Sequence, residues 1–240
     1  MNLFTGLQQR RVVPEIMDQP DLDSERHVHA LQSLRRINSV SLTSTLVWTA
    51  IDDYLSNRTN SVKPLRILDI ATGGGDVPIA LSKKLQRSSC PVEIHGCDVH
   101  SQAVRFAEAT AGQSGANVRF FQHDVIKQGI PEGYDILLCG LFLHHLELDD
   151  TLVLLQGMAN ACKELLVIND LERSVWHVAL AYVACYSLTR SDVVRFDGPA
   201  SVRAGYRLPE IRAIAGSAGL TEARFTRHWP FRWRMVWRKS

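Results

Sequence analysis

The sequence predicts an α/β protein built on a mostly parallel sheet with helices on both faces. Between residues 65 and 168, short apolar runs alternate with helical patterns, which is the signature of βαβ units with right-handed crossovers. The runs are almost wholly apolar, as expected for strands that are covered on both sides. A glycine-rich segment directly follows the first run, so we also expect a ligand site at the end of that strand.

The composition is that of an ordinary folded protein. The chain has 240 residues, of which 45% are apolar and 22% charged, enough for a sizeable core and for one large or two small domains. These numbers exclude a disordered chain and a disulfide-stapled miniprotein. The net charge of +2 is too weak to predict a nucleic-acid or membrane partner.

The cysteines and the apolar runs predict a cytoplasmic location. Five scattered cysteines without CxxC spacing support neither a zinc ribbon nor a redox pair and are typical of a reducing compartment. The first residues lack the apolar core of a signal peptide. The longest apolar run, Val175–Leu188, is shorter than the ~20 residues that a membrane helix needs.

Residues 1–64 predict an N-terminal arm and a helical cap. The polar start contains two prolines, and Asp23 or Ser24 can cap a helix whose apolar stripe ends at Ile37. A second helical pattern runs from Leu42 to Leu55 and ends in the polar segment 57–64. We expect residues 65–240 to form the main domain, as one structural unit with the cap.

The elements of the main domain follow in order along the chain. The expected strands cover 65–71, 92–99, 118–121, 134–140 and 164–168, followed after an insertion by 222–228 and 231–238. The expected helices end at 85 and cover 101–113, opened by a capping Ser101, then 151–162, 174–188 and 209–218. The alternation stops over 171–208, which predicts a substrate-side insertion with an irregular segment over 190–206.

The strongest motif is the segment Leu65–Pro78, LRILDIATGGGDVP. It predicts an apolar strand, an acidic residue, a glycine-rich turn and the start of a helix. Glycines in such a turn let the backbone approach a ligand. The dinucleotide fingerprint GxGxxG fails because Pro78 takes its last position, and no Gly-Lys-Ser/Thr of a P-loop follows. A tight structural turn without a ligand is the alternative interpretation.

This segment resembles motif I of class I S-adenosylmethionine-dependent methyltransferases, D/E-x-G-x-G-x-G, with an alanine in place of the first glycine. The resemblance implies S-adenosylmethionine as cofactor. It also implies a Rossmann-like seven-stranded, mostly parallel sheet with an antiparallel last strand. The cofactor-binding residues that it implies in this segment are Asp69, Ala71, Thr72, Gly73 and Gly75.

Two further acidic residues close the next two predicted strands. Asp98 lies 23 residues after Gly75, where Rossmann-like sites hold a carboxylate that binds ribose hydroxyls; a solvated residue or a helix cap is the alternative. At Asp124, the resemblance implies contact with the adenine amino group, and a plain turn residue is the alternative. Their neighbours Val99 and Val125 are expected in the same site.

The fourth strand separates types of methyltransferase. The Asn/Asp-Pro-Pro-aromatic motif and the Pro-Cys nucleophile of nucleic-acid enzymes are absent, and the segment is similar to small-molecule methyltransferases of menaquinone, ubiquinone and polyketide-associated secondary metabolism. The resemblance implies a small hydroxylated aromatic or quinone-like acceptor. His144 and His145 follow the strand, and an imidazole with a pKa near 6.5 suits removal of a hydroxyl proton. A packing or capping role is the alternative.

Asp170 closes the fifth strand and is a candidate substrate-binding residue or second base, with a helix cap as the alternative. A magnesium site of the catechol type would need an acidic residue at 139–141, where the chain has Cys-Gly-Leu, so we expect no metal. In the insertion, Trp176, Tyr182 and Tyr186 predict either an aromatic wall of the substrate site or core packing.

Two other functions stay open at this stage. Arginines at 224, 227, 232, 234 and 238 favour an RNA or protein methyltransferase slightly, although they can simply face water. The chain can also be a catalytically silent cofactor-binding protein. The favoured hypothesis is a small-molecule acceptor. It includes neither a nucleic acid nor a membrane as partner, and it allows a homodimer.

Overall fold

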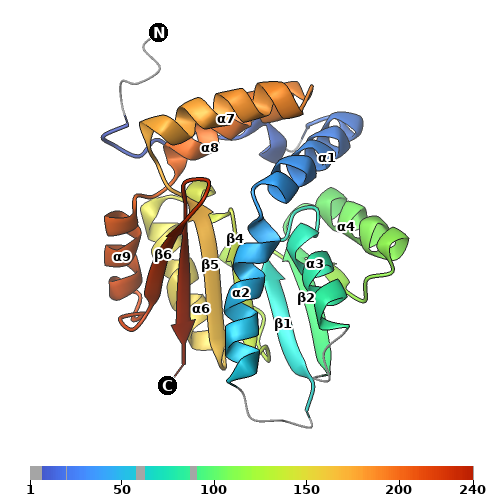
Figure 1. Ribbon diagram of the computed structural model, residues 1–240, viewed down its shortest axis with the longest axis vertical. Helices are drawn as coiled ribbons and strands as arrows, with labels where there is room; N and C mark the ends of the chain where they lie inside the picture. Colours follow the sequence, from blue (N-terminus) through green and yellow to red (C-terminus); the bar gives the residue numbers. More distant parts are fainter. Residues whose placement is uncertain (1–6, 20, 58–62, 87–90, 240) are drawn as a thin grey trace.

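One seven-stranded sheet organises the computed structural model, which describes residues 7–19, 21–57, 63–86 and 91–239. The strand order is β3-β2-β1-β4-β5-β7-β6 (Figure 1). The strands are β1 (Leu65–Ile70), β2 (Val92–Asp98), β3 (Arg119–Gln122), β4 (Ile136–Gly140), β5 (Leu165–Leu171), β6 (Arg224–His228) and β7 (Arg232–Arg238). Strands β1 to β5 are parallel and β7 is antiparallel to both neighbours, which confirms the predicted fold class.

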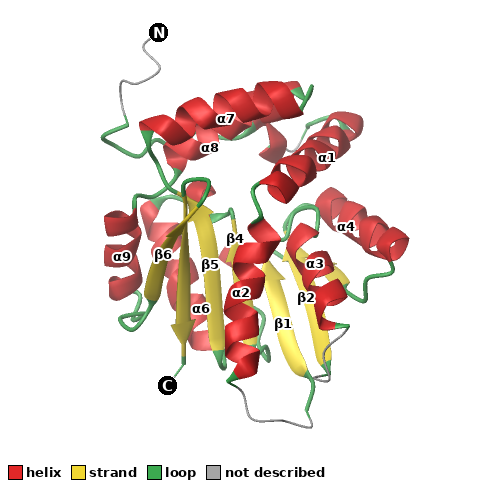
Figure 2. Cartoon of the chain, in the orientation of Figure 1, coloured by secondary structure: helices red, strands yellow, loops and turns green. Residues whose placement is uncertain are grey.

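Helices cover both faces of the sheet (Figure 2). On one face α2 (Thr43–Ser56) and α3 (Asp76–Leu85) pack on the sheet, next to α4 (Ser101–Ser114). On the other face lie α6 (Leu148–Ala161) and α9 (Leu208–Ser217). The neighbouring β1 residues Ile67 and Leu68 belong to the two opposite cores, and both are fully buried. Two-sided burial is why the strand is apolar at nearly every position.

A layer of further segments lies across the carboxyl end of the parallel strands (Figure 1). It consists of η1 (Ile16–Asp18), α1 (Ser24–Val40), α7 (Val175–Leu188) and α8 (Asp192–Ala204). The buried residues Ala30, Cys185 and Val194 join α1, α7 and α8 in one apolar cluster. We call this layer the roof, and it faces the sheet edge where βα loops place ligand sites.

The prediction of an irregular segment over 190–206 is wrong, because most of it is helix α8. Gly198 and Pro199, which both disfavour a helix interior, suggested a loop. The helix forms because its packing against α7 overrides these propensities. A Cβ on Gly198 would collide with Cys185 Sγ on α7, so this glycine permits the close approach of the two helices.

Of the helix caps predicted from the sequence, the one at Asp23 is present and the one at Ser101 is not. Asp23 caps α1 by accepting hydrogen bonds from the backbone N–H groups of Glu25 and Arg26. The predicted capping role of Ser101 is wrong, since α4 begins at this residue and His100 holds the cap position without a side-chain bond. The predicted break over 57–64 lies partly outside the described residues.

The described cysteines are buried thiols. Cys97, Cys139, Cys162 and Cys185 are buried and free, while Cys90 lies outside the described residues. Burial raises the pKa of Cys97 to about 12. Within the described ranges, no helix combines the length and the apolar character that crossing a membrane requires.

Candidate active site

A cavity of about 700 Å³ lies between the carboxyl edge of the sheet and the roof. On the sheet side it is lined by residues that follow β1, β2, β3 and β4. On the roof side it is lined mainly by apolar residues of α1, α7 and α8. Of the predicted cofactor residues, those that line it are Asp69, Ala71, Thr72, Gly73, Asp98, Val99, Asp124 and Val125.

The glycine-rich loop after β1 forms one wall of this cavity. Ala71 and Gly73 both have positive φ angles, 52° and 53°, and Ala71 holds the place of a glycine in the motif. A Cβ built on Gly73 has no neighbour within 4 Å, so this backbone is open to an approaching ligand.

Gly75 departs from the predicted cofactor role. It does not line the cavity. It is the N-cap of α3 and has a left-handed conformation with a φ of 77°. A Cβ on Gly75 would lie 2.8 Å from the ring of Phe120. The glycine is therefore needed for packing between the loop and β3.

Asp69 is a buried acid at the end of β1. Its side chain accepts a hydrogen bond from Thr72 Oγ1 at 2.6 Å. Burial raises the pKa of Asp69 to about 7, the charges of Asp98 and Asp76 add to the rise, and the Thr72 bond opposes it. A cationic ligand in the cavity would favour the ionised form.

Asp98 connects the first two loops. Its Oδ2 accepts a hydrogen bond from the backbone N–H of Gly73 at 2.8 Å, and its Oδ1 accepts one from His100 at 2.9 Å. Asp98 is therefore both a cavity-lining carboxylate and a brace for the glycine-rich loop. Val99 is largely exposed beside it.

Asp124 caps the short helix α5 (Val125–Gln128). Its Oδ1 accepts hydrogen bonds from the backbone N–H groups of Ile126 and Lys127, both at 3.1 Å. This is the turn role considered for it from the sequence, and the residue lines the cavity as well. Val125 is buried and also lines the cavity.

His144 and Asp170 form a buried pair beside the cavity. His144 Nδ1 lies 2.6 Å from Asp170 Oδ1, and the backbone N–H of His144 donates to Asp170 Oδ2 at 3.1 Å. Burial opposes ionisation of Asp170, but the His144 ring and backbone donors lower its pKa. Asp170 is 1% exposed and does not line the cavity, so it lies behind His144 and not in contact with a ligand.

His145 pairs with the N-terminal arm. Its Nδ1 lies 3.0 Å from Asp18 Oδ2. Burial lowers the pKa of His145, but Glu15 and Asp18 outweigh this effect and raise it to about 9. At neutral pH this histidine therefore carries a proton on both ring nitrogens.

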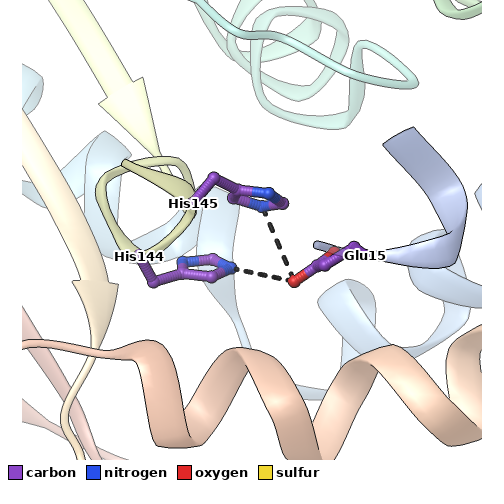
Figure 3. A group of neighbouring side chains, drawn as sticks. All are labelled: Glu15, His144 and His145. Carbon is purple, nitrogen blue, oxygen red and sulfur yellow. Dashed lines mark ion pairs between the residues drawn. The ribbon is translucent and has the colours of Figure 1, made fainter. Parts of the chain in front are cut away.

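Glu15, a residue of the arm, brings the two histidines together (Figure 3). Its Oε1 lies 3.8 Å from His144 Nε2 and 3.9 Å from His145 Nε2. The three ligand atoms all lie within 4.8 Å of one another, so this set has the chemistry of a metal site. The sequence predicts no metal because residues 139–141 lack an acidic side chain, whereas Glu15 reaches the histidines from the distant N-terminal arm.

The arm residues at this site give no signal in the sequence. Glu15 and Asp18 belong to a polar segment without periodicity. Arg10 holds the arm in place: its guanidinium donates to the carbonyls of His144 and Leu146 and lies 4.0 Å above the ring of Tyr206.

The predicted aromatic wall is not formed by α7. Trp176 and Tyr186 are 75% and 59% exposed. Tyr182 packs against the apolar cluster that contains Val178 and Val202, but it does not itself line the cavity. The α7 residues that do line the cavity are Leu180, Ala181, Ala184, Cys185 and Leu188, together with His177.

Comparison with known proteins gives matches to the central part of the chain. Residues 67–164 match the family described as "Methyltransferase domain". The chain is 31% identical over 91 residues to the release factor glutamine methyltransferase of Bacillus subtilis, covering 38% of this chain and 30% of that protein. It is 27% identical over 127 residues to the ubiquinone biosynthesis O-methyltransferase of Serratia proteamaculans, covering 52% and 44%. A demethylmenaquinone methyltransferase of Deinococcus radiodurans is 34% identical over 77 residues, covering 32% and 30%. The chain thus spans less than half the length of these relatives.

Solved structures match over more of the chain. A SAM-dependent methyltransferase from Aquifex aeolicus superposes with a TM-score of 0.62 at 18% identity, covering 91% of this chain and 99% of that one. The magnesium protoporphyrin IX methyltransferase of Synechocystis, with bound SAM, gives 0.58 at 15% identity, covering 92% and 100%. At these identities the likeness concerns the fold. Residues 67–164 therefore match a methyltransferase domain, and the fold of the chain is like that of S-adenosylmethionine-dependent methyltransferases.

Proposed function

We propose that the protein transfers a methyl group from S-adenosylmethionine to a hydroxyl of a small hydroxylated aromatic or quinone-like acceptor. The observation that carries the proposal is the His144–Asp170 pair, which opens onto the same cavity as the glycine-rich loop. One chamber therefore contains both a loop suited to the cofactor and a base suited to the acceptor.

The cofactor occupies the half of the cavity over β1, β2 and β3. Asp98 supplies a carboxylate for ribose hydroxyls, and Asp124 with Val125 borders the adenine. The acidic Asp69 favours the positive charge of the sulfonium group. Gly73 leaves room for the cofactor chain beside the loop.

The chemistry is a direct displacement. The acceptor oxygen forms a bond to the methyl carbon, the carbon–sulfur bond breaks, and sulfur keeps the electron pair. The protein mainly aligns the three atoms. The hydroxyl proton passes to Nε2 of His144, and the charge that develops on the ring is stabilised by Asp170 at Nδ1.

The charge of His145 and the position of Asp170 leave His144 as the favoured base. His145 already carries its proton at neutral pH, and Asp170 does not reach the cavity. Asp170 is then a positioning residue, which orients the ring and fixes the proton on Nδ1, as carboxylates do in His–Asp pairs.

The apolar roof supports an aromatic or quinone-like acceptor. Leu180, Ala184 and Leu188 of α7 line the cavity, and such a surface suits a flat, apolar ring. The ubiquinone and demethylmenaquinone methyltransferases among the relatives agree with this acceptor class. A cytoplasmic location, a role in secondary metabolism and a homodimer belong to the same proposal.

The test is a screen of phenols and hydroxyquinones for methyl transfer, followed by variants of the pair. We expect His144→Ala and Asp170→Asn to lower turnover by ~100–10,000-fold, with the affinity for S-adenosylhomocysteine nearly unchanged. His29→Ala, on α1 and outside the cavity lining, is the control. Near-normal turnover in both variants would show that His144 is not a base. The acceptor would then react as an already ionised phenolate that the protein only aligns with the methyl group.

An RNA or protein acceptor is the second candidate, because release factor glutamine methyltransferases are among the relatives. Of the arginines that suggested it, Arg227 pairs with Glu172, Arg238 pairs with Asp53, and Arg232 is buried. Salt-dependent RNA binding would favour this candidate. Cofactor binding without turnover of any acceptor would favour a silent binding protein.

A further inference from the structure

Arg232, the first residue of β7, is a buried cation that lines the cavity. Its Nη1 donates to Thr43 Oγ1 at 2.5 Å and its Nη2 to Ser41 Oγ at 2.9 Å. Its Nε has no acceptor among the residues that the structure describes. A guanidinium has five N–H donors, and the two hydroxyl oxygens satisfy only part of them.

No carboxylate of the described residues forms an ion pair with Arg232. The charge of Asp170 attracts Arg232 electrostatically, but the two side chains are too far apart for an ion pair, and Asp170 is hydrogen-bonded to His144. Burial lowers the pKa of Arg232 to about 10, and Asp170 opposes the change, so the group stays charged at neutral pH. A buried charge without a counter-ion is costly.

Arg173 shows how this fold treats a buried arginine with a structural role. Its guanidinium is also buried, and it contacts Glu210 Oε1 at 2.6 Å and the carbonyls of Leu7 and Gly205. Each part of that group meets an acceptor. Arg232 has no such carboxylate partner among the described residues, and it borders the cavity.

The register of the sheet puts Arg232 on the acceptor half of the cavity. It pairs with Leu171, directly after Asp170 on β5. The predicted cofactor residues follow β1, β2 and β3, and β4 separates these from β5 in the strand order. A ligand group beside Arg232 therefore belongs to the acceptor and not to the cofactor.

We propose that Arg232, with Ser41 and Thr43, forms a subsite for a carboxylate of the acceptor. The acceptor is then a hydroxylated aromatic acid, whose anionic end supplies the missing counter-ion. A planar guanidinium matches a carboxylate in shape as well as charge. This inference rests on the proposed function, because it uses the same cavity.

The first experiment measures binding of a panel of hydroxybenzoates and hydroxynaphthoates, each beside its neutral carboxamide, to protein saturated with S-adenosylhomocysteine. We expect the acids to bind at least ~10-fold more tightly, and we expect Arg232→Met to remove the preference while Arg232→Lys keeps part of it. The readout is calorimetric or by ligand-observed NMR and does not require turnover. Failure of the His144 base would therefore leave this result intact.

The second experiment separates recognition from structure. We expect Arg232→Met to keep or raise the melting temperature, because it removes an uncompensated charge and Ser41 and Thr43 still bond to each other. The matched control Arg173→Met should lower it, since it removes the described donor to Glu210 Oε1 and to the Gly205 carbonyl.

Three results would overturn the proposal. One is equal binding of acids and carboxamides, or binding of no acid, in the wild type. Another is a loss of stability in Arg232→Met as large as in Arg173→Met. The third is a variant Arg232→Met that binds S-adenosylhomocysteine more weakly but binds 5′-methylthioadenosine, which has no carboxylate, as the wild type does. The carboxylate that Arg232 recognises would then be that of the cofactor.

Discussion

Single residues decide the electrostatics of the cavity, and Asp69 is the clearest case. The folded state holds the pKa of Asp69 near 7, above the ordinary value of 3.8 that applies to the unfolded chain. The folded protein therefore keeps a proton between about pH 4 and pH 7 that the unfolded chain has released. Stability from this group is present below pH 4 and is lost as the pH rises through 7.

We expect Asp69→Asn to raise the free energy of unfolding, and to do so more at pH 8 than at pH 5, by roughly 2 kcal/mol. The physical reason is that the variant never buries the charge. Urea denaturation at the two pH values measures the effect. A gain that is equal at both values would show that the carboxyl group titrates normally.

Gly73 and Gly75 should respond differently to the same substitution. Both glycines have positive φ angles, so a valine strains the backbone at either position. At Gly73 the new side chain has no protein neighbour and fills cavity space, so we expect Gly73→Val to weaken S-adenosylhomocysteine binding by more than ~10-fold. A valine at Gly75 meets the Phe120 ring, so Gly75→Val should lower the melting temperature most. Calorimetric titration and thermal unfolding of both variants check this, and the opposite assignment would contradict the placement of the two glycines.

At the scale of elements, the contact between α7 and α8 shapes the roof of the cavity. Cys185 of α7 faces the Cα of Gly198 in α8, and both residues line the cavity. Because the helices approach this closely only without a side chain at 198, the width of the acceptor half depends on one glycine.

We expect Gly198→Ala to lower the free energy of unfolding by about 1–3 kcal/mol through overpacking. Adding Cys185→Ala should recover part of this loss, since it removes the sulfur that the new Cβ would meet. The measurement is a double-mutant cycle by urea denaturation. Purely additive effects would mean that the two helices do not contact each other at this point.

At the scale of the whole molecule, the arm, the roof and the sheet meet at Glu15, His144 and His145. We expect turnover to be independent of metal, because a metal at this cluster would have to displace the proton that His145 carries at neutral pH beside Glu15. Turnover in EDTA, compared with turnover after addition of Mg²⁺ or Zn²⁺, tests this. Activity lost in EDTA and restored by Zn²⁺ in the wild type, but not in Glu15→Gln, would make the cluster a metal site.

The sequence by itself determined the sheet and its ligand-binding edge. The strands between 65 and 171 could be predicted because two-sided burial makes each one a continuous apolar run, and the loop after β1 because its glycines stand directly after a strand. Asp69, Asp98 and Asp124 could be placed at one edge because parallel strands all end there. These signals are local in the chain.

Only the tertiary structure decided which side chains meet at the acceptor half. Asp18 reaches His145 across 127 positions, Arg232 reaches Ser41 across 191, and Ile16 donates to Asp197 across 181. Helix α8 likewise forms against the propensity of Gly198 and Pro199, because packing on α7 stabilises it. Periodicity and motif spacing report which face a residue occupies within its own element, whereas these contacts depend on how distant elements pack, and this is why Glu15 and Arg232 could be recognised only in the folded chain.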